Sequence, residues 1–563
     1  MLTVPKFTPH FPSQQWTLPD VLEHQARVIG DQPFLRWEDA SNFLSFHEVN
    51  RRVNRLAHGL ARLGVDRGDA VAMLMPNSLD FVLTWFAVNK LGAIEVPINT
   101  AYKGDFLQHQ VNISGATTLI ADIGLIDSVI DSIAQLPKID RVVFWSRCAE
   151  AQLDVPKLDR VRVSAFATLD SDNESNPGVR VRPQDIAAII FTSGTTGPSK
   201  GVLMPHAQCY LFAENGVQVT QLTSSDCYAT AFPLFHANAQ VLSIYPCLIA
   251  GARCVLYERF SATSWVERLH TSGATVINSI GVMLPFVYAQ PPTARDDTHQ
   301  MRRILSAPVP DGIVEEFKRR FGVRHITTAF GQTEICLPFI SPLQYNDARP
   351  RGAAGLLVDQ FFEARIVNPD TDMEVAEGDV GELILRHKQP WTINAGYVGM
   401  PDKTAEVWRN LWFHTGDALR RDAQGWYYFV DRFKDALRRR GENISSFEVE
   451  APMRRHPAVA DVAVIAIPAD EGGEDEIKAC IVLKPGHRTS YEEIVKWCES
   501  LLPYFAVPRY LEFMDEFPRT PSEKIQKNQL RSAGRTAATW DRISAGVYLR
   551  EEIERTKRKQ KPT

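Results

Sequence analysis

The chain has 563 residues, of which 44% are apolar and 23% charged, a composition typical of a globular protein rather than a disordered one. Its 62 basic and 67 acidic side chains leave a net charge of -5, which gives no electrostatic reason to expect nucleic acid as a partner. A chain of this length is expected to form roughly two to four domains.

The eight cysteines are scattered, without a CxxC pair or closely spaced histidines. They are interpreted as reduced core thiols of a cytoplasmic protein, not as disulfides or metal ligands. Residues 1–20 lack a basic start followed by an apolar block, so no signal peptide is expected. Residues 227–252 contain no Asp, Glu, Lys or Arg, but Pro233, Pro246 and His236 interrupt them, which favours buried core over a membrane span.

Predicted helices and strands alternate from Leu18 to about Val179. Apolar residues recur at helical spacing in residues 18–29 and 46–65, and residues 70–76 have the pattern of a strand. Residues 78–99 are predicted to form a helix that runs into another strand. This alternation predicts an α/β fold with a largely parallel sheet covered by helices.

A second alternation begins near Gly251 and ends at the segment "FGQTE", residues 330–334. The shorter strand patterns "EARIVN" and "VGELILR" follow, and they predict a small barrel or a distorted sheet that completes the large N-terminal unit. The expected fold class is therefore α/β, with a large N-terminal domain of layered α/β subdomains plus a small barrel-like subdomain, and a smaller mobile α+β C-terminal domain.

The composition changes around Asp431, where a charged segment precedes a compact α+β pattern. We therefore predict an N-terminal domain over 1–431, a C-terminal domain over 432–545 and a basic, disordered tail over 546–563. Within the second domain, Ser490 and Glu493 have the spacing of a capping box at a helix start.

The stretch "FTSGTTGPSKGV", residues 191–202, follows the apolar run "DIAAII", which has the pattern of a buried strand. Its glycines allow main-chain N–H groups to approach a tetrahedral anion, and its hydroxyls and Lys200 add donors and charge, which predicts a phosphate site. Pro198 and Ser199 separate Gly197 from Lys200, which excludes a Walker A loop. A mobile surface loop is the alternative.

Five further motifs follow this loop in the chain. They are "FGQTE" (330–334), "HTGD" (414–417), "DRFKD" (431–435), "RGENIS" (440–445) and "PRTPSEKIQK" (518–527). With them the chain resembles the adenylate-forming superfamily of acyl-CoA synthetases, peptide-synthetase adenylation domains and firefly-type luciferases. Within it, "RRRGENISSFEVE" and "TWDRISAGVYLR" are most similar to crotonobetaine/carnitine-CoA ligases and bacterial diterpenoid-acid ligases.

The resemblance implies an enzyme that uses ATP and Mg²⁺ to activate a small-molecule carboxylic acid as an acyl-adenylate, and then transfers the acyl group to CoA. A homodimer is left open. The resemblance also implies the phosphate ligands, which are Thr192, Ser193, Gly194, Thr195, Thr196, Gly197 and Lys200. In the same way, the segment Ser306, Ala307 and Pro308 is expected at the nucleotide.

In "FGQTE", the resemblance places Phe330 and Gly331 at the adenine, Thr333 at the α-phosphate and Glu334 on Mg²⁺, with Thr196 as a second metal ligand. For Glu334 alone, an ordinary surface carboxylate would be the default. Phe330 stands where tyrosine is more usual, which keeps stacking but removes a hydroxyl.

The remaining implied nucleotide and catalytic residues come from the later motifs. Asp417 is the expected ribose ligand, and Arg432 supports the ribose or a phosphate. Lys524 is the expected adenylation lysine, although Glu523 stands where glycine is more usual. The resemblance also implies that 1–431 is an N-terminal ATP- and acyl-binding domain and that 432–545 is a mobile domain, which rotates about a hinge at Lys434 between the half-reactions.

Rotation is expected to bring Gly441 to the pantetheine of CoA. For the basic run of Arg438, Arg439 and Arg440, contact with the CoA phosphates and a solvated face are the two alternatives.

His236 stands where the superfamily places an aromatic gate beside the acyl carboxylate, and a hydrogen-bonded core histidine is the alternative. A positioning role is favoured over general-base catalysis, because a carboxylate is already ionised at neutral pH. The acyl pocket is expected to use Val282, Met283, Phe286 and Tyr288.

These pocket residues favour an apolar, bulky polycyclic acid. The alternatives are a carnitine or crotonobetaine-type acid, an enzyme that loads a carrier protein, a luciferase-like oxygenase and a non-catalytic nucleotide-binding homologue.

Overall fold

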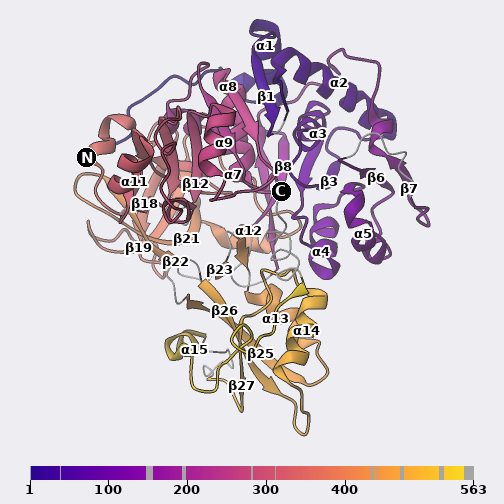
Figure 1. Cartoon of the computed structure of the whole chain (residues 1–563), viewed down its shortest axis with the longest axis vertical. Helices are drawn as coiled ribbons and strands as arrows, with labels where there is room; N and C mark the ends of the chain where they lie inside the picture. Colours follow the sequence, from indigo (N-terminus) through magenta and orange to yellow (C-terminus); the bar gives the residue numbers. More distant parts are fainter. Residues whose placement is uncertain are drawn as a thin grey trace. The chain divides into compact units, whose positions relative to one another are not determined.

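The computed structural model describes residues 2–38, 40–147, 156–192, 198–280, 283–310, 312–432, 437–439, 442–444, 446–469, 475–518, 525 and 527–550 (Figure 1). The chain separates into two compact units. Unit 1 comprises Met1–Thr100, Val111–Phe191 and Gly201–Phe433, and unit 2 comprises Ala101–Gln110, Thr192–Lys200 and Lys434–Thr563. The mixed α/β class with a larger N-terminal and a smaller C-terminal part is confirmed.

Unit 1 contains a seven-stranded sheet in which every pairing is parallel except that of the last strand, β2. Its strands, in spatial order, are β14 (His325–Thr327), β13 (Arg303–Ala307), β12 (Val276–Ile280), β10 (Cys227–Thr230), β11 (Arg253–Leu256), β1 (Pro33–Trp37) and β2 (Leu44–Ser45).

A second seven-stranded sheet of unit 1 is parallel from its first strand to β8. Its strands are β7 (Arg162–Ala165), β6 (Arg141–Trp145), β5 (Thr118–Asp122), β3 (Ala70–Leu74), β4 (Ile94–Pro97), β8 (Ile186–Thr192) and β9 (Lys200–Pro205). The predicted parallel sheet is thus confirmed, and β8 ends at Thr192, where the predicted phosphate loop begins in the sequence.

Helices alternate with these strands along the chain (Figure 1). They are α1 (Leu18–Val28), α2 (Phe46–Leu63), α3 (Leu79–Lys90), α4 (Gly104–Ser114), α5 (Ile126–Ile133), α6 (His206–Thr220), α7 (Ala237–Ala239), α8 (Tyr245–Ala250), α9 (Trp265–Ser272), α10 (Met283–Tyr288), α11 (Val314–Phe321) and α12 (Pro401–Val407). Between α7 and α8 lies the π-helix η4 (Gln240–Ile244). Short 3₁₀ turns are η1 (Ser13–Gln15), η2 (Ile123–Leu125), η3 (Phe166–Leu169) and η5 (Leu343–Ala348).

The third sheet of unit 1 has eight strands and is antiparallel throughout. Its strands are β15 (Ala329–Gln332), β16 (Cys336–Ile340), β17 (Ala353–Leu357), β22 (Trp426–Arg432), β21 (Trp412–Arg421), β19 (Gly381–His387) and β18 (Phe362–Val367), with β20 (Trp408–Arg409) beside β21. This sheet carries two of the predicted nucleotide motifs.

Unit 2 contains a four-stranded sheet and a two-stranded ribbon. Its elements are β23 (Leu437–Arg439), β24 (Glu442–Ile444), α13 (Ser446–Arg454), β25 (Val459–Pro468), β26 (Asp475–Leu483), α14 (Tyr491–Leu501), β27 (Tyr510–Met514), α15 (Lys527–Ala533) and β28 (Trp540–Asp541). The predicted capping box is confirmed, because Ser490 accepts from the N–H of Glu493 at 3.2 Å and Glu493 accepts from the N–H of Ser490 at 3.1 Å.

The uncharged run of residues 227–252 forms β10, α7, η4 and α8, and Tyr228 and Tyr245 within it have no exposed surface. Within the described ranges, no helix combines the length and the apolar character needed to cross a bilayer. Seven cysteines are described, and all are buried free thiols, as predicted. Cys148 and residues 551–563 of the predicted tail lie outside the described residues.

Candidate functional site

Two motifs that lie far apart in the sequence meet in the antiparallel sheet. "FGQTE" begins on β15, and "HTGD" lies on β21. The Nε2 of Gln332 donates to Asp417 Oδ2 at 2.5 Å and to the carbonyl of Thr415 at 3.3 Å. Asp417 is only 2% exposed. The two motifs predicted at the adenine and the ribose are therefore joined by a direct side-chain contact.

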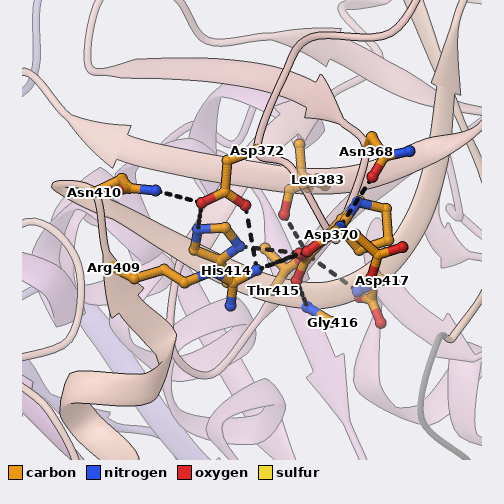
Figure 2. Close-up of polar contacts among 12 residues, drawn as sticks. Asn368, Asp370, Asp372, Leu383, Arg409, Asn410, His414, Thr415, Gly416 and Asp417 are labelled. Carbon is orange, nitrogen blue, oxygen red and sulfur yellow. Dashed lines mark hydrogen bonds and ion pairs between the residues drawn. The ribbon is translucent and has the colours of Figure 1, made fainter.

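The "HTGD" backbone is held by neighbouring side chains and carbonyls (Figure 2). The Thr415 hydroxyl donates to the carbonyl of Leu383 at 2.7 Å and accepts from the N–H of Asp417 at 3.1 Å. The N–H of Gly416 donates to Glu382 Oε1 at 3.0 Å. These bonds connect β21 to β19 and fix the direction of the Asp417 carboxylate.

A charged cluster lies behind this backbone. His414 Nδ1 lies 2.9 Å from Glu382 Oε2, and a guanidinium nitrogen of Arg409 is 3.3 Å from both Glu382 and Asp372. Figure 2 shows Asp372, Arg409 and His414 converging, with Asn410 donating to Asp372. Burial tends to raise the pKa of Asp372, but the hydrogen bonds from Arg409 and Asn410 outweigh it and hold the pKa below its usual value. Asp372 is therefore held as a carboxylate paired with Arg409.

Glu334, the predicted metal ligand, is 9% exposed. Its Oε1 accepts from the Tyr397 hydroxyl at 3.0 Å, and its carbonyl accepts from the N–H of Asn394 at 2.9 Å. Tyr397 also bridges to Val202 on β9, the strand that leaves the phosphate loop. Glu334 is thus connected through Tyr397 to the strand after the predicted phosphate ligands.

Of the predicted phosphate ligands, Thr192 ends β8 and Lys200 begins β9. The others lie outside the described residues: Ser193, Gly194, Thr195, Thr196 and Gly197.

Phe330 and Gly331 lie on β15 beside two aromatic rings and a turn. The Phe330 ring is 5.8 Å from that of Phe429, with 30° between their planes, and Phe429 is 44% exposed. A Cβ at Gly331 would lie 1.9 Å from the carbonyl oxygen of Cys336, so the β15–β16 hairpin requires glycine there. Thr333 follows, and its carbonyl accepts from Gln208 Nε2 at 2.7 Å.

The segment Ser306, Ala307 and Pro308 ends β13. Ser306 is buried, and its hydroxyl donates to the carbonyl of Pro308 at 2.9 Å. Ala307 and Pro308 are exposed, and the peptide bond between them is cis.

His236 follows β10, two positions along the sheet from β13. Its N–H donates to the carbonyl of Pro233 at 3.1 Å, and its ring lies 4.6 Å from that of Phe235. Asn278 on β12 donates to Asn238, which joins the His236 segment to the sheet. Because carboxyl ends of parallel strands share one edge, His236 and Ser306 lie on the same edge of the sheet.

Three predicted site residues, Lys434, Gly441 and Lys524, lie outside the described residues, as does the side chain of Arg432. The backbone of Arg432 is described, and its Cα pairs with that of Asp417 across β21 and β22. The division between the units falls after Phe433, directly before the predicted hinge Lys434.

Arg439, in the basic run 438–440, neither contacts CoA phosphates nor lies on a solvated face, the two alternatives predicted for that run. Its side chain is 2% exposed, its Nε lies 2.8 Å from Glu476, and its guanidinium donates to the carbonyls of Phe505 and Val507 at 3.1 and 2.9 Å. A guanidinium held by a carboxylate and two carbonyls in the core of unit 2 cannot reach CoA phosphates or form a solvated face. Arg438 and Arg440 have no described side chains.

The motifs did not single out Gln332, Glu382, Tyr397 or Phe429. Gln332 and Glu382 stand inside predicted elements, but their partners are 85 and 32 residues away. A buried glutamate within an otherwise apolar strand, as in "VGELILR", is the signal that could have indicated Glu382.

Residues 22–398 match the model of the AMP-binding enzyme family, and residues 448–524 match that of the AMP-binding enzyme C-terminal domain. A crotonobetaine/carnitine–CoA ligase of Escherichia coli is 31% identical over 523 residues, which cover 92% of this chain and 98% of the relative. A ligase of the same name from Shigella flexneri is 31% identical over 525 residues, with the same coverage.

Solved structures show the same fold. An o-succinylbenzoate CoA synthetase from Bacillus subtilis, bound with a product analogue, has a TM-score of 0.78 at 23% identity and covers 94% of this chain and 99% of its own. An anthranilate CoA ligase in complex with anthranoyl-AMP has a TM-score of 0.67 at 25% identity, with 93% and 98% covered.

Proposed function

The chain belongs to the AMP-binding enzyme family and is an AMP-forming acid–thiol ligase, and from this we propose that it converts an apolar carboxylic acid into its CoA thioester in two steps. In the first step a carboxylate oxygen of the acid attacks the α-phosphorus of ATP, and pyrophosphate leaves. In the second step the thiolate of CoA attacks the acyl carbon, and AMP leaves. The hydrogen bond between Gln332 and Asp417 carries this proposal, because it unites the adenine and ribose motifs.

The nucleotide would lie along the antiparallel sheet. Asp417, a short buried carboxylate with a fixed direction, accepts hydrogen bonds from the ribose hydroxyls, with Arg432 nearby. Phe330 and the exposed ring of Phe429 offer an apolar surface for adenine, and Thr333 reaches the α-phosphate. The phosphate loop, ending in Lys200, holds the β- and γ-phosphates.

The residues present fit a magnesium ion that is shared with the nucleotide. Among the described residues no group of three or more His, Cys, Asp or Glu could hold a metal alone, and Mg²⁺ is usually bound by one or two carboxylates plus substrate phosphates. Glu334, together with Thr196 of the loop, would hold the ion, which neutralises phosphate charge when bound.

The acid would lie beside His236 and the segment that begins with Ser306. Helix α10 supplies Met283, Phe286 and Tyr288, and Phe286 is 57% exposed, so an apolar side chain is available to a ligand. We favour a bulky polycyclic acid on this basis. Lys524 would contact the acid and the α-phosphate during adenylation, and rotation about Lys434 would then bring Gly441 to CoA. The proposal includes a cytoplasmic location, because buried free thiols suit a reducing compartment.

Similarity to ligases named for crotonobetaine and carnitine favours a second candidate, a short betaine acid. The deciding experiment measures pyrophosphate release from the purified enzyme with Mg²⁺, ATP and CoA across fatty, aromatic, terpenoid and betaine acids. Acid-dependent pyrophosphate and acyl-CoA with an apolar acid support the first candidate. Turnover of betaine acids alone would replace it, and no acid-dependent pyrophosphate with any acid would contradict both.

A further inference from the structure

The turn that carries His236 is held by buried side-chain amides. Asn77 Nδ2 donates to the carbonyl of Phe232 at 2.9 Å, and its Oδ1 accepts from the N–H of Leu234 at 2.8 Å. Gln240 Nε2 donates to the carbonyl of Leu234 at 2.7 Å. Asn77 is 8% and Gln240 1% exposed. The main chain just before His236 is therefore fixed from two sides.

Gln240 connects this turn to the second parallel sheet. It begins the π-helix η4, and π-helical turns occur frequently at functional sites. Its Nε2 also donates to Glu95 Oε1 at 2.8 Å, so both hydrogens of the amide are used. Glu95 lies on β4 and has no exposed surface.

Glu95 is suited to this place as a neutral acid. In the described part of the chain, its second oxygen, Oε2, has no hydrogen-bond partner. A carboxylate that receives one amide hydrogen in a fully buried site is strongly disfavoured. Burial raises the pKa of Glu95 well above its ordinary value, and the hydrogen bond from Gln240 offsets this only in part. The protonated group therefore acts as a fixed acceptor for Gln240.

We propose that Asn77, Gln240 and Glu95 are positioning residues that hold the turn before His236 and thereby set where its ring meets the carboxylate of the substrate acid. The inference rests on the proposed function, in which His236 lies beside that carboxylate. A group displaced by about an ångström from its position against the substrate loses much of its effect. Because Asn77, Gln240 and Glu95, which we call the clamp, hold the turn beside the acid, they are expected to control binding of the acid rather than of ATP.

The test compares two buried glutamines. Gln240→Leu removes the bonds to Leu234 and Glu95, whereas Gln25→Leu, the matched control, removes two similar bonds to the carbonyls of Leu248 and Ile249. Loss of one or two such bonds predicts a KM for the acid raised on the order of tenfold in Gln240→Leu, with the KM for ATP within about twofold of wild type. Gln25→Leu is expected to leave both KM values unchanged. Equal KM values for the acid in the two variants would overturn the proposal.

A second pair of variants examines the acid on β4. Glu95→Leu should raise the KM for the acid as Gln240→Leu does, and Glu95→Gln should rescue it, because a glutamine carbonyl can still accept from Gln240 without a charge. Failure of this rescue in a variant with a wild-type melting temperature would contradict the neutral acceptor assigned to Glu95.

A double-mutant cycle shows whether the clamp acts through His236. If it does, Gln240→Leu should change the KM for the acid by less than about twofold in a His236→Ala background. An undiminished effect there would assign Gln240 to general stability. Because Asn77→Asp keeps the acceptor for Leu234 and loses the donor to the carbonyls of Phe232 and Tyr257, it repeats the test should Gln240→Leu fail to fold. A wild-type enzyme without pyrophosphate release would refute the proposed function itself, and the clamp is judged only against an active wild type.

Discussion

Asp417 is a buried carboxylate that accepts a hydrogen bond from Gln332 at 2.5 Å, and its backbone N–H is held by the Thr415 hydroxyl. We expect Asp417→Asn to raise the KM for ATP by about tenfold to a hundredfold, because an amide replaces one acceptor oxygen with a donor and removes the charge that strengthens both ribose hydrogen bonds. Initial rates at varied ATP and varied acid separate the two KM values. An increase confined to the KM for the acid would be inconsistent with a ribose ligand.

At this scale the sequence predicts residues whose role is set by a short motif. Asp417 lies on β21 and Glu334 in the turn between β15 and β16, and the residues that orient them, Gln332 and Tyr397, become visible only when segments distant in sequence come together. Arg439 shows the opposite case. Three consecutive arginines indicate a basic surface, but only the folded sheet reveals that Glu476 and two carbonyls bury the middle one.

The β15–β16 hairpin is an element whose geometry depends on one glycine. A methyl group at Gly331 would meet the Cys336 carbonyl, which is backbone and cannot rotate away. We therefore expect Gly331→Ala to lower the free energy of unfolding by roughly 1–3 kcal/mol, the usual cost of overpacking, and to weaken ATP binding.

Gly312→Ala serves as the control, because a Cβ there meets nothing within 4 Å and its backbone lies outside the left-handed region. Urea denaturation and nucleotide titration of both variants give the comparison. Equal urea midpoints for the Gly331→Ala and Gly312→Ala variants would contradict the close approach of residue 331 to the Cys336 carbonyl.

Elements that depend on the spacing of nearby residues were predicted from the sequence. Features that depend on pairing between distant segments were not. The capping box of α14 and the parallel strands follow from spacing within a few residues. The order of the antiparallel sheet, in which β17 lies beside β22, depends on pairing across about seventy residues, and the π-helix η4 has no marker in its sequence. The domain boundaries near residues 431 and 545 stay predictions.

At the scale of the whole molecule, the N-terminal segment is attached to helix α6 by an ion pair and by main-chain hydrogen bonds, since the N–H groups of His10 and Phe11 donate to Glu214 and Tyr210. His10 Nδ1 lies 3.0 Å from Glu214, which also accepts from Tyr210. The hydrogen bond to Glu214 raises the pKa of His10 despite the opposing effect of burial. A raised folded pKa means that the pair stabilises the fold fully below the unfolded value of 6.5 and loses this contribution as the pH rises through the folded value.

We expect His10→Gln to be less stable than wild type below pH 6.5 and the difference to shrink at higher pH. Denaturation midpoints measured across this range provide the check, with His487→Gln as a control, since the His487 ring lies against the carbonyl of Pro485, two residues away, and not against an acidic side chain of the described residues. A difference that stays constant with pH would exclude titration of His10 as its cause.

The proposed reaction requires two different arrangements of the smaller unit. Adenylation needs a lysine at the α-phosphate, and thioester formation needs an entrance for the thiol of CoA. The chain divides into its two units directly before Lys434, which agrees with a rotation there that provides the two arrangements in turn.

Lys524→Ala should therefore lower adenylate formation on the order of a hundredfold or more, the effect of losing one charge-stabilising group, while thioester formation from preformed acyl-adenylate stays within about twofold of wild type. Gly441→Leu should do the reverse, because its side chain would occupy the space required by pantetheine. Pyrophosphate release and acyl-CoA formation from synthetic adenylate measure the two steps separately, with Lys484→Ala as a surface control whose ammonium donates to the carbonyl of Pro457. Equal loss of both steps in Lys524→Ala would show that the lysine serves the fold rather than one half-reaction.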